Sequence, residues 1–237
     1  MKFVVHKSED RGETSIGWLQ SRHSFSFGSF YDSSKNGFGV LRVLNDDFVS
    51  AGNGFGKHGH KNMEIISIPL SGTMEHKDSM GNVSTITPNK IQVMSAGSGI
   101  EHSEYNKSET DDLKFLQIWI TPNQLNVHPR YDEFVLDHHL MSDTWLQILS
   151  PNVNDSGVWI HQNSWFNLSE INEGKTLEYE QNDIRNGIYI FVLEGECLVN
   201  SIELSQKDGL GLWENDKVII TSKTKCKVLL MEVPLKQ

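Results

Sequence analysis

Short apolar runs separated by turn-forming residues are the feature that most constrains the fold of this chain. The runs GVLRVLND, KIQVMSAGSG, LKFLQIWITP and IYIFVLEGECLVN adjoin clusters of glycine, asparagine, aspartate or serine. Runs of this length and spacing are typical of β-strands joined by tight turns. Long amphipathic helical periodicity is scarce, so we predict an all-β fold built as a sandwich or barrel.

An internal repeat indicates that the chain holds two such units. Ile66-Ser-Ile-Pro-Leu-Ser-Gly72 and Ile190-Phe-Val-Leu-Glu-Gly195 each contain an apolar strand that ends at a glycine turn, and a second strand follows. We therefore predict two stacked β-barrels, with residues 1–132 in the first domain and 133–237 in the second. Residues 132–146 are expected to form a short helix or an irregular crossing segment.

Two pairs of polar residues are the strongest candidates for a functional site. His58 and His60 are separated by one residue, and His102 and Glu104 show the same spacing. Alternate side chains of a strand point to the same face, so each pair can project together. If the two strands face each other across a barrel, three imidazoles and one carboxylate converge. Such a set suits Fe, Mn, Co, Ni, Cu or Zn.

The alternation of side chains along a strand predicts which later residues share the face of His60. Counting on from His60, the positions Glu64, Ile66 and Ile68 are predicted to share its side of the barrel, with ligands at one end and aliphatic core at the other. Glu64 is then either an outer partner of the ligands or a partly solvated carboxylate at a strand end. His76 precedes a turn, and the polarity of a hairpin edge accounts for it.

An aromatic stripe near the N-terminus has two interpretations. His23 alternates with Phe25 and Phe27 in the segment HSFSF. Aromatic side chains at alternating positions normally bury one face of a strand, which favours core packing. The same stripe can instead line a pocket for an aromatic substrate, and the sequence leaves both interpretations open.

Composition and charge exclude several classes of function. The formal net charge is −10 and the chain has no basic run, so we expect no nucleic-acid binding. The sequence contains no apolar stretch of membrane-spanning length and no signal-like N-terminus, so we expect a cytoplasmic protein without membrane association.

Cys197 and Cys226 lie in apolar stretches and are expected to be buried free thiols. A monomer is expected.

The same residues carry a family resemblance. HGHKNMEIISIPLSGTMEHKDSMGN, followed by QVMSAGSGIEHSE, resembles the pirin family of bicupins. The segments around Trp18, Leu41 and Gln117 are also similar to bacterial members, and the likeness is strongest in residues 15–121. Gly59 stands where proline is common in the family and Lys90 where glycine is typical, but neither change removes a ligand.

The resemblance implies two stacked cupin barrels with the metal in the N-terminal one and a second barrel without metal ligands. It implies one divalent transition-metal ion per chain, held by His58, His60, His102 and Glu104. Iron is the first choice, while nickel, copper, manganese, cobalt and zinc stay open.

The resemblance also implies an activity. Several family members are quercetin 2,3-dioxygenases, which open the central ring of a flavonol with O₂, and Glu104 is then the catalytic base. Eukaryotic relatives act instead as nuclear cofactors of transcription factors. The alternative is therefore a redox-sensing metal module that docks a protein partner.

Overall fold

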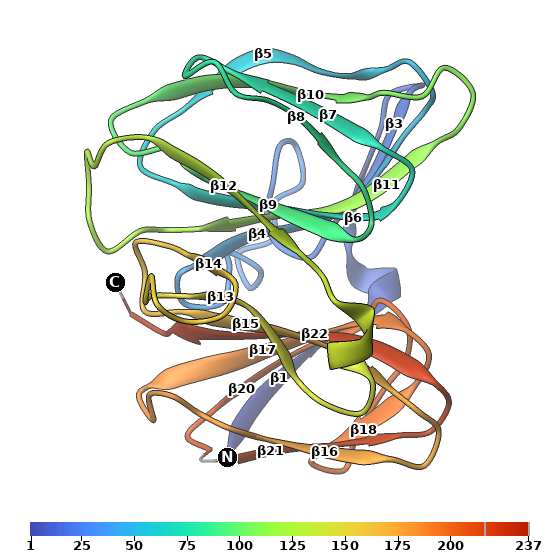
Figure 1. The fold of residues 1–237 in the computed structure, drawn as a ribbon. Helices are drawn as coiled ribbons and strands as arrows, with labels where there is room; N and C mark the ends of the chain where they lie inside the picture. Colours follow the sequence, from blue (N-terminus) through green and yellow to red (C-terminus); the bar gives the residue numbers. More distant parts are fainter. Residues whose placement is uncertain (216, 237) are drawn as a thin grey trace.

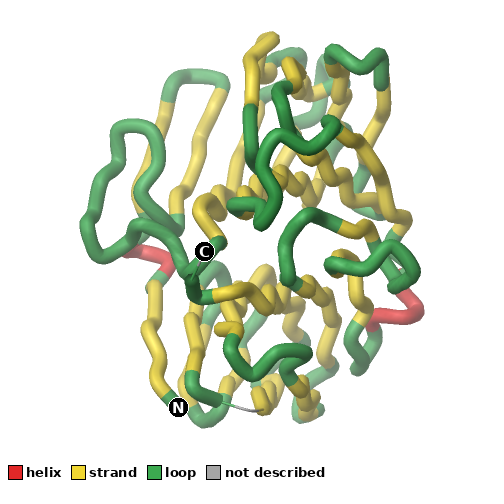
Figure 2. The backbone as a smooth tube through the Cα atoms, turned by 90° about the vertical axis from the view of Figure 1, so that its left-hand side faces the viewer, coloured by secondary structure: helices red, strands yellow, loops and turns green. Residues whose placement is uncertain are grey.

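Four β-sheets stacked in layers make up the protein. The computed structural model describes residues 1–215 and 217–236. A four-stranded sheet lies at each end of the stack and two seven-stranded sheets lie between them (Figure 1). The described residues contain two helical segments, η1 (Ser8–Asp10) and η2 (His138–Met141), and both are single short turns (Figure 2). The prediction of an all-β fold is confirmed. No described helix has the length and apolar character that a membrane crossing requires.

One seven-stranded sheet and one four-stranded sheet form the N-terminal barrel, and all their strand pairs are antiparallel. In pairing order, the larger sheet consists of β12 (Arg130–Val135), β9 (Lys90–Ser95), β6 (Glu64–Ser71), β11 (Leu113–Ile120), β4 (Leu41–Val49), β3 (Leu19–His23) and β2 (Gly12–Ser15). The smaller sheet consists of β5 (Gly54–His60), β10 (Ile100–Asn106), β7 (Met74–Asp78) and β8 (Val83–Ile86).

The C-terminal barrel repeats this arrangement. In pairing order, its larger sheet consists of β1 (Lys2–His6), β20 (Gly209–Trp213), β17 (Asn186–Glu194), β22 (Cys226–Pro234), β15 (Trp165–Ile171), β13 (Leu146–Ser150) and β14 (Val158–Trp159). Its smaller sheet consists of β16 (Thr176–Glu180), β21 (Lys217–Ser222), β18 (Cys197–Val199) and β19 (Ile202–Leu204). Both cysteines are buried free thiols, as predicted.

The two glycines of the sequence repeat occupy corresponding turns. Gly72 joins β6 to β7 and Gly195 joins β17 to β18, so each lies where the chain leaves a seven-stranded sheet for a four-stranded one. Their φ angles are +79° and +78°, and an added Cβ would lie 2.5 Å from the Asp112 carbonyl oxygen and 2.3 Å from that of Lys225. Only glycine meets both demands without strain. The repeat therefore reflects the same sheet-to-sheet turn in both barrels.

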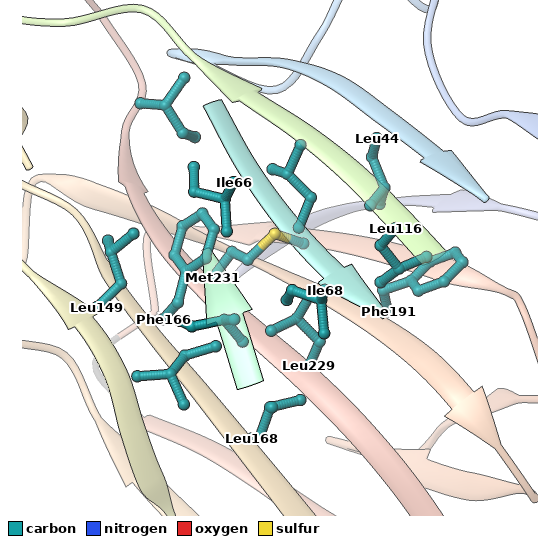
Figure 3. Close-up of a cluster of buried hydrophobic side chains, with 14 of the residues drawn as sticks. Leu44, Ile66, Ile68, Leu116, Leu149, Phe166, Leu168, Phe191, Leu229 and Met231 are labelled. Atoms are coloured by element: carbon teal, nitrogen blue, oxygen red, sulfur yellow. The ribbon is translucent and has the colours of Figure 1, made fainter. Parts of the chain in front are cut away.

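The largest apolar core lies between the two seven-stranded sheets. Figure 3 shows side chains of β4, β6 and β11, such as Leu44, Ile66 and Leu116, in one cluster with Phe166 and Met231 of the C-terminal barrel. These five side chains are at most 1% exposed. Burial of apolar surface is the main favourable term in folding, so this shared core holds the barrels together.

Strand pairing crosses the predicted domain limits at both ends. β1 begins the chain but pairs with β20 in the C-terminal sheet, and β12 pairs with β9 in the N-terminal sheet as far as Val135. Pairing by β1 covers an edge of β20 that would otherwise present unpaired backbone groups. We therefore propose that the connection between the barrels spans residues 136–145. For residues 132–146 we predicted a short helix or an irregular crossing segment. The structure has both features beyond Val135: η2 forms a single turn within an otherwise irregular connection, and residues 132–135 belong to β12.

Candidate metal centre

Three histidines of the four-stranded N-terminal sheet lie together. His58 and His102 are direct cross-strand partners on β5 and β10, and His60 ends β5. The ring centroids are 4.4 Å apart for His58 and His102, 4.8 Å for His58 and His60, and 4.9 Å for His60 and His102. One ring nitrogen of each lies within 4.8 Å of the others. The predicted convergence of these three imidazoles is therefore seen in the structure.

Burial keeps two of these imidazoles neutral. Loss of hydration, reinforced by neighbouring histidines, lowers the pKa of His102 to about 3 and that of His60 to about 4. His102 is 1% exposed, and neither of its ring nitrogens has a hydrogen-bond partner among the described residues. Buried polar atoms are rarely left unpaired, and the neutral imidazole is the form that binds metals. These residues therefore fit a divalent transition metal.

Glu104 lies two residues beyond His102, after a register shift in the pairing of β10 with β5. The Ser67 hydroxyl donates to Oε1 over 3.0 Å, Gln117 Nε2 donates to Oε2 over 2.8 Å, and Gln92 Nε2 also donates to Oε1. These donors come from β6, β11 and β9 on the seven-stranded sheet. Burial raises the pKa of Glu104. The carboxyl group is thus oriented by the opposite wall of the barrel.

His76 belongs to this centre as well. One ligand-type atom from each of His76, His102 and Glu104 lies within 4.8 Å of the others, so His102 is shared by two groups. The His76 ring is fully buried, stacks on Tyr131 at 4.6 Å between centroids, and has its Nε2 3.3 Å from Asp78 Oδ2. Hairpin-edge polarity does not account for a fully buried ring, so that interpretation was wrong. β7 lies inside its sheet, between β10 and β8.

Glu64 does not join the histidines. Residues 61–63 separate β5 from β6, so the alternation counted from His60 is reset by a turn. Ile66 and Ile68 point into the core between the large sheets, and the prediction of a shared face was wrong. Glu64 instead accepts a hydrogen bond from the Ser95 hydroxyl at 2.7 Å, and burial raises its pKa to about 7.

A cavity of about 460 Å³ opens beside the histidines. This volume lies in the range of roughly 300–1,000 Å³ that is usual for small-molecule sites. His23 and Phe27 line the cavity, whereas Phe25 packs in the core between the large sheets, so each interpretation of the aromatic stripe holds for part of it. The lining residues are Thr14, Trp18, Leu19, Ser21, His23, Phe27, Asn45, Asp47, Gly54, Phe55, Gly56, His58, His60, Glu104, Gln117 and Trp119.

Strands β2 to β4 add a polar wall to this cavity, which the sequence did not reveal. His23 donates from Nδ1 to Asn45 Oδ1 over 2.8 Å and accepts at Nε2 from the Thr14 hydroxyl over 2.9 Å. This tautomer follows because an amide oxygen can only accept. Asp47 is 5% exposed, and burial raises its pKa to about 7 against a smaller opposing effect of the Ser21 hydroxyl. No residue spacing marks Asn45 or Asp47 as part of a site.

Two stacked cupin barrels with one histidine-rich centre in the N-terminal barrel define a bicupin with a divalent-metal site. Sequence comparison narrows this class. The family model described as Pirin matches residues 4–120, and the model described as Quercetinase C-terminal cupin domain matches residues 147–233. The chain belongs to the pirin family, as the resemblance indicated.

Known relatives match the chain over nearly its full length. It is 38% identical over 234 residues to a quercetin 2,3-dioxygenase of Escherichia coli K12, covering 97% of this chain and 98% of that one. Its structure matches the crystal structure of YhhW from E. coli with a TM-score of 0.94 at 36% identity, covering 100% of both chains. It also matches bacterial pirin YhhW from E. coli in complex with nickel(II), with a TM-score of 0.93 at 36% identity, covering 98% and 99%. The name of the K12 relative supports the expectation that this protein is an oxidoreductase of the dioxygenase class.

Proposed function

We propose that this protein is a metal-dependent dioxygenase that opens the central ring of a flavonol such as quercetin with O₂. One observation carries the proposal: a cavity of small-molecule size is lined by His58, His60 and the buried, hydrogen-bonded carboxyl group of Glu104. The names of the relatives support the reaction class, and the nickel-bound relative supports a divalent metal.

In this proposal His58, His60, His102 and Glu104 hold one divalent ion per chain. Iron is the first choice, although three nitrogens and one oxygen suit nickel, copper, manganese, cobalt or zinc as well. When bound, the metal supplies Lewis-acid chemistry that lowers the pKa of a coordinated hydroxyl group. The residues that surround the ligands then decide which hydroxyl group is presented and where its proton goes.

Glu104 is the proposed base for the 3-hydroxyl group of the flavonol. A buried carboxyl group with a raised pKa accepts a proton more readily than one in water. Ser67, Gln92 and Gln117 keep its oxygens in place, so the group does not have to reorient during proton transfer. Phe27, Phe55 and Trp119 line the adjacent cavity and give it apolar walls on which an aromatic substrate can pack.

Metal content and flavonol binding test the proposal together. Wild type, His58→Ala and Glu104→Ala would be purified, and their metal measured by mass spectrometry. Quercetin binding would be followed without O₂ as a shift of the flavonol absorption band, and turnover with O₂ as bleaching. His139→Ala is the matched control, because His139 is exposed and lies in η2.

We expect about one metal ion per chain in wild type and in the His139→Ala control, with metal lost in His58→Ala. Bleaching should occur in wild type and not in Glu104→Ala. If metal-loaded wild type neither binds nor bleaches quercetin, the proposed dioxygenase activity is refuted. The alternative of a regulatory, redox-sensing module is then favoured. If wild type cannot be loaded with metal, the proposed metal centre itself is refuted.

A further inference from the structure

We propose that Asp47 determines substrate specificity by accepting a hydrogen bond from a ring hydroxyl group of the bound flavonol, separate from the 3-hydroxyl group at the metal. This assignment rests on the proposed dioxygenase function and narrows it. The favoured substrates are then flavonols that carry a second hydroxyl group on the ring that reaches β4.

The alternation of β4 places two neighbouring carboxylates on opposite sides of its sheet. Asp46 faces the C-terminal barrel, where its Oδ2 lies 3.1 Å from Lys207 Nζ and 3.6 Å from Arg11 Nη2. Asp47 faces the other way and lines the cavity, in register with Ser21 on β3. The Asp46 carboxylate therefore has cationic partners, whereas the Asp47 carboxylate has no ion-pair partner among the described residues.

One oxygen of Asp47 lacks a donor. Asp47 Oδ1 is buried and has no hydrogen-bond partner among the residues that the structure describes. The polar groups beside it do not supply this donor. The Ser21 hydroxyl lies close enough to lower the pKa of Asp47, but it makes no hydrogen bond with Oδ1. The Nδ1 hydrogen of His23 is directed to Asn45, and the Thr14 hydroxyl donates to His23. A buried acceptor without a donor is costly, and Asp47 lines the cavity, so a donor on a bound molecule would stabilise this carboxyl group.

The cavity lining indicates what kind of molecule supplies that donor. The aromatic rings of Phe27, Phe55 and Trp119 line the same space, so a planar aromatic ligand fits beside them. A phenolic hydroxyl group is a good donor to a carboxyl oxygen. An aromatic acid would instead place a second negative charge against Asp47, which is unfavourable.

Paired flavonols test the assignment on metal-loaded protein. Quercetin carries ring hydroxyl groups besides the 3-hydroxyl group, and 3-hydroxyflavone carries the 3-hydroxyl group alone. Dissociation constants for both would be measured without O₂ by quenching of tryptophan fluorescence, in wild type, Asp47→Leu and Asp47→Asn. Asp46→Asn is the matched control because the same type of side chain lies one residue away on the opposite face. Circular dichroism and metal content would verify that each variant is folded and loaded.

We expect wild type to favour quercetin over 3-hydroxyflavone by roughly 10- to 100-fold, as is usual for a hydrogen bond to a charged group. Asp47→Leu should reduce this ratio about tenfold or more, and Asp47→Asn should reduce it less because the amide oxygen still accepts. The Asp46→Asn control should keep the wild-type ratio. If Asp47→Leu does not fold, the ratio in Asp47→Asn decides.

Two different results would overturn the role assigned to Asp47, and each has its own consequence for the proposed function. If flavonols bind but the ratio is the same in wild type and in the Asp47 variants, Asp47 does not recognise the ring hydroxyl group and the dioxygenase function stands. If metal-loaded wild type binds neither flavonol, the proposed function fails and the role of Asp47 fails with it.

Discussion

Replacing Glu64 by glutamine should make the protein more stable at alkaline pH and change its stability little at acidic pH. The Glu64 side chain is 1% exposed, and burial raises its pKa from 4.5 to about 7 despite the Ser95 hydroxyl and the charge of Arg130. The folded protein therefore binds this proton more tightly than the unfolded chain does. The resulting stability is fully present below about pH 4.5 and is lost as the pH rises through about 7.

The size of the effect follows from the two pKa values. A shift from 4.5 to about 7 corresponds to about 3 kcal/mol, at about 1.4 kcal/mol for each pKa unit. Most of this difference develops between about pH 5 and about pH 8. Glutamine has no such proton to lose, and its side-chain oxygen still accepts from Ser95. The variant should therefore gain about 2–3 kcal/mol over wild type across this interval.

Urea unfolding followed by tryptophan fluorescence at several pH values measures the difference. Metal-free protein would be used so that metal binding does not add its own pH dependence. Glu180→Gln is the matched control, since Glu180 is exposed, and its stability relative to wild type should change little with pH. A constant difference between Glu64→Gln and wild type from pH 5 to pH 8 would refute the argument, because the carboxyl group would then titrate alike in both states.

Further predictions concern the metal centre and the core. His102→Ala removes the residue shared by both ligand groups and should abolish metal binding, measured by mass spectrometry of the loaded protein. His76→Phe keeps the stack on Tyr131 but removes both nitrogens; we expect metal affinity to fall roughly 10- to 100-fold in chelator competition, and full loss would instead make His76 a ligand. Phe166→Ala should cost about 3–5 kcal/mol in urea unfolding, whereas Phe3→Ala, at a position 52% exposed, should cost far less. Light scattering of the purified protein tests the expected monomer.

Much of the fold can be predicted from local sequence signals. The apolar runs and their turn residues predict strands, because alternation and turn chemistry depend on neighbours along the chain. The repeat around Gly72 and Gly195 predicts two similar units, since each glycine meets the same demand for a left-handed turn. The spacing of His58 with His60 likewise brings two imidazoles to one face of one strand.

Pairing between distant strands decided the remaining features. His76 joins the centre because β7 pairs with β10, and Asp47 lines the cavity because β3, β4 and β11 are neighbours. Parity counted from His60 failed at Glu64, since a turn between strands resets which face each residue takes. Strand order and register depend on contacts across the whole barrel, and local spacing does not contain them. The sequence by itself therefore determined the strands, the turns and the histidine pair, while only the tertiary structure decided which polar groups share the cavity.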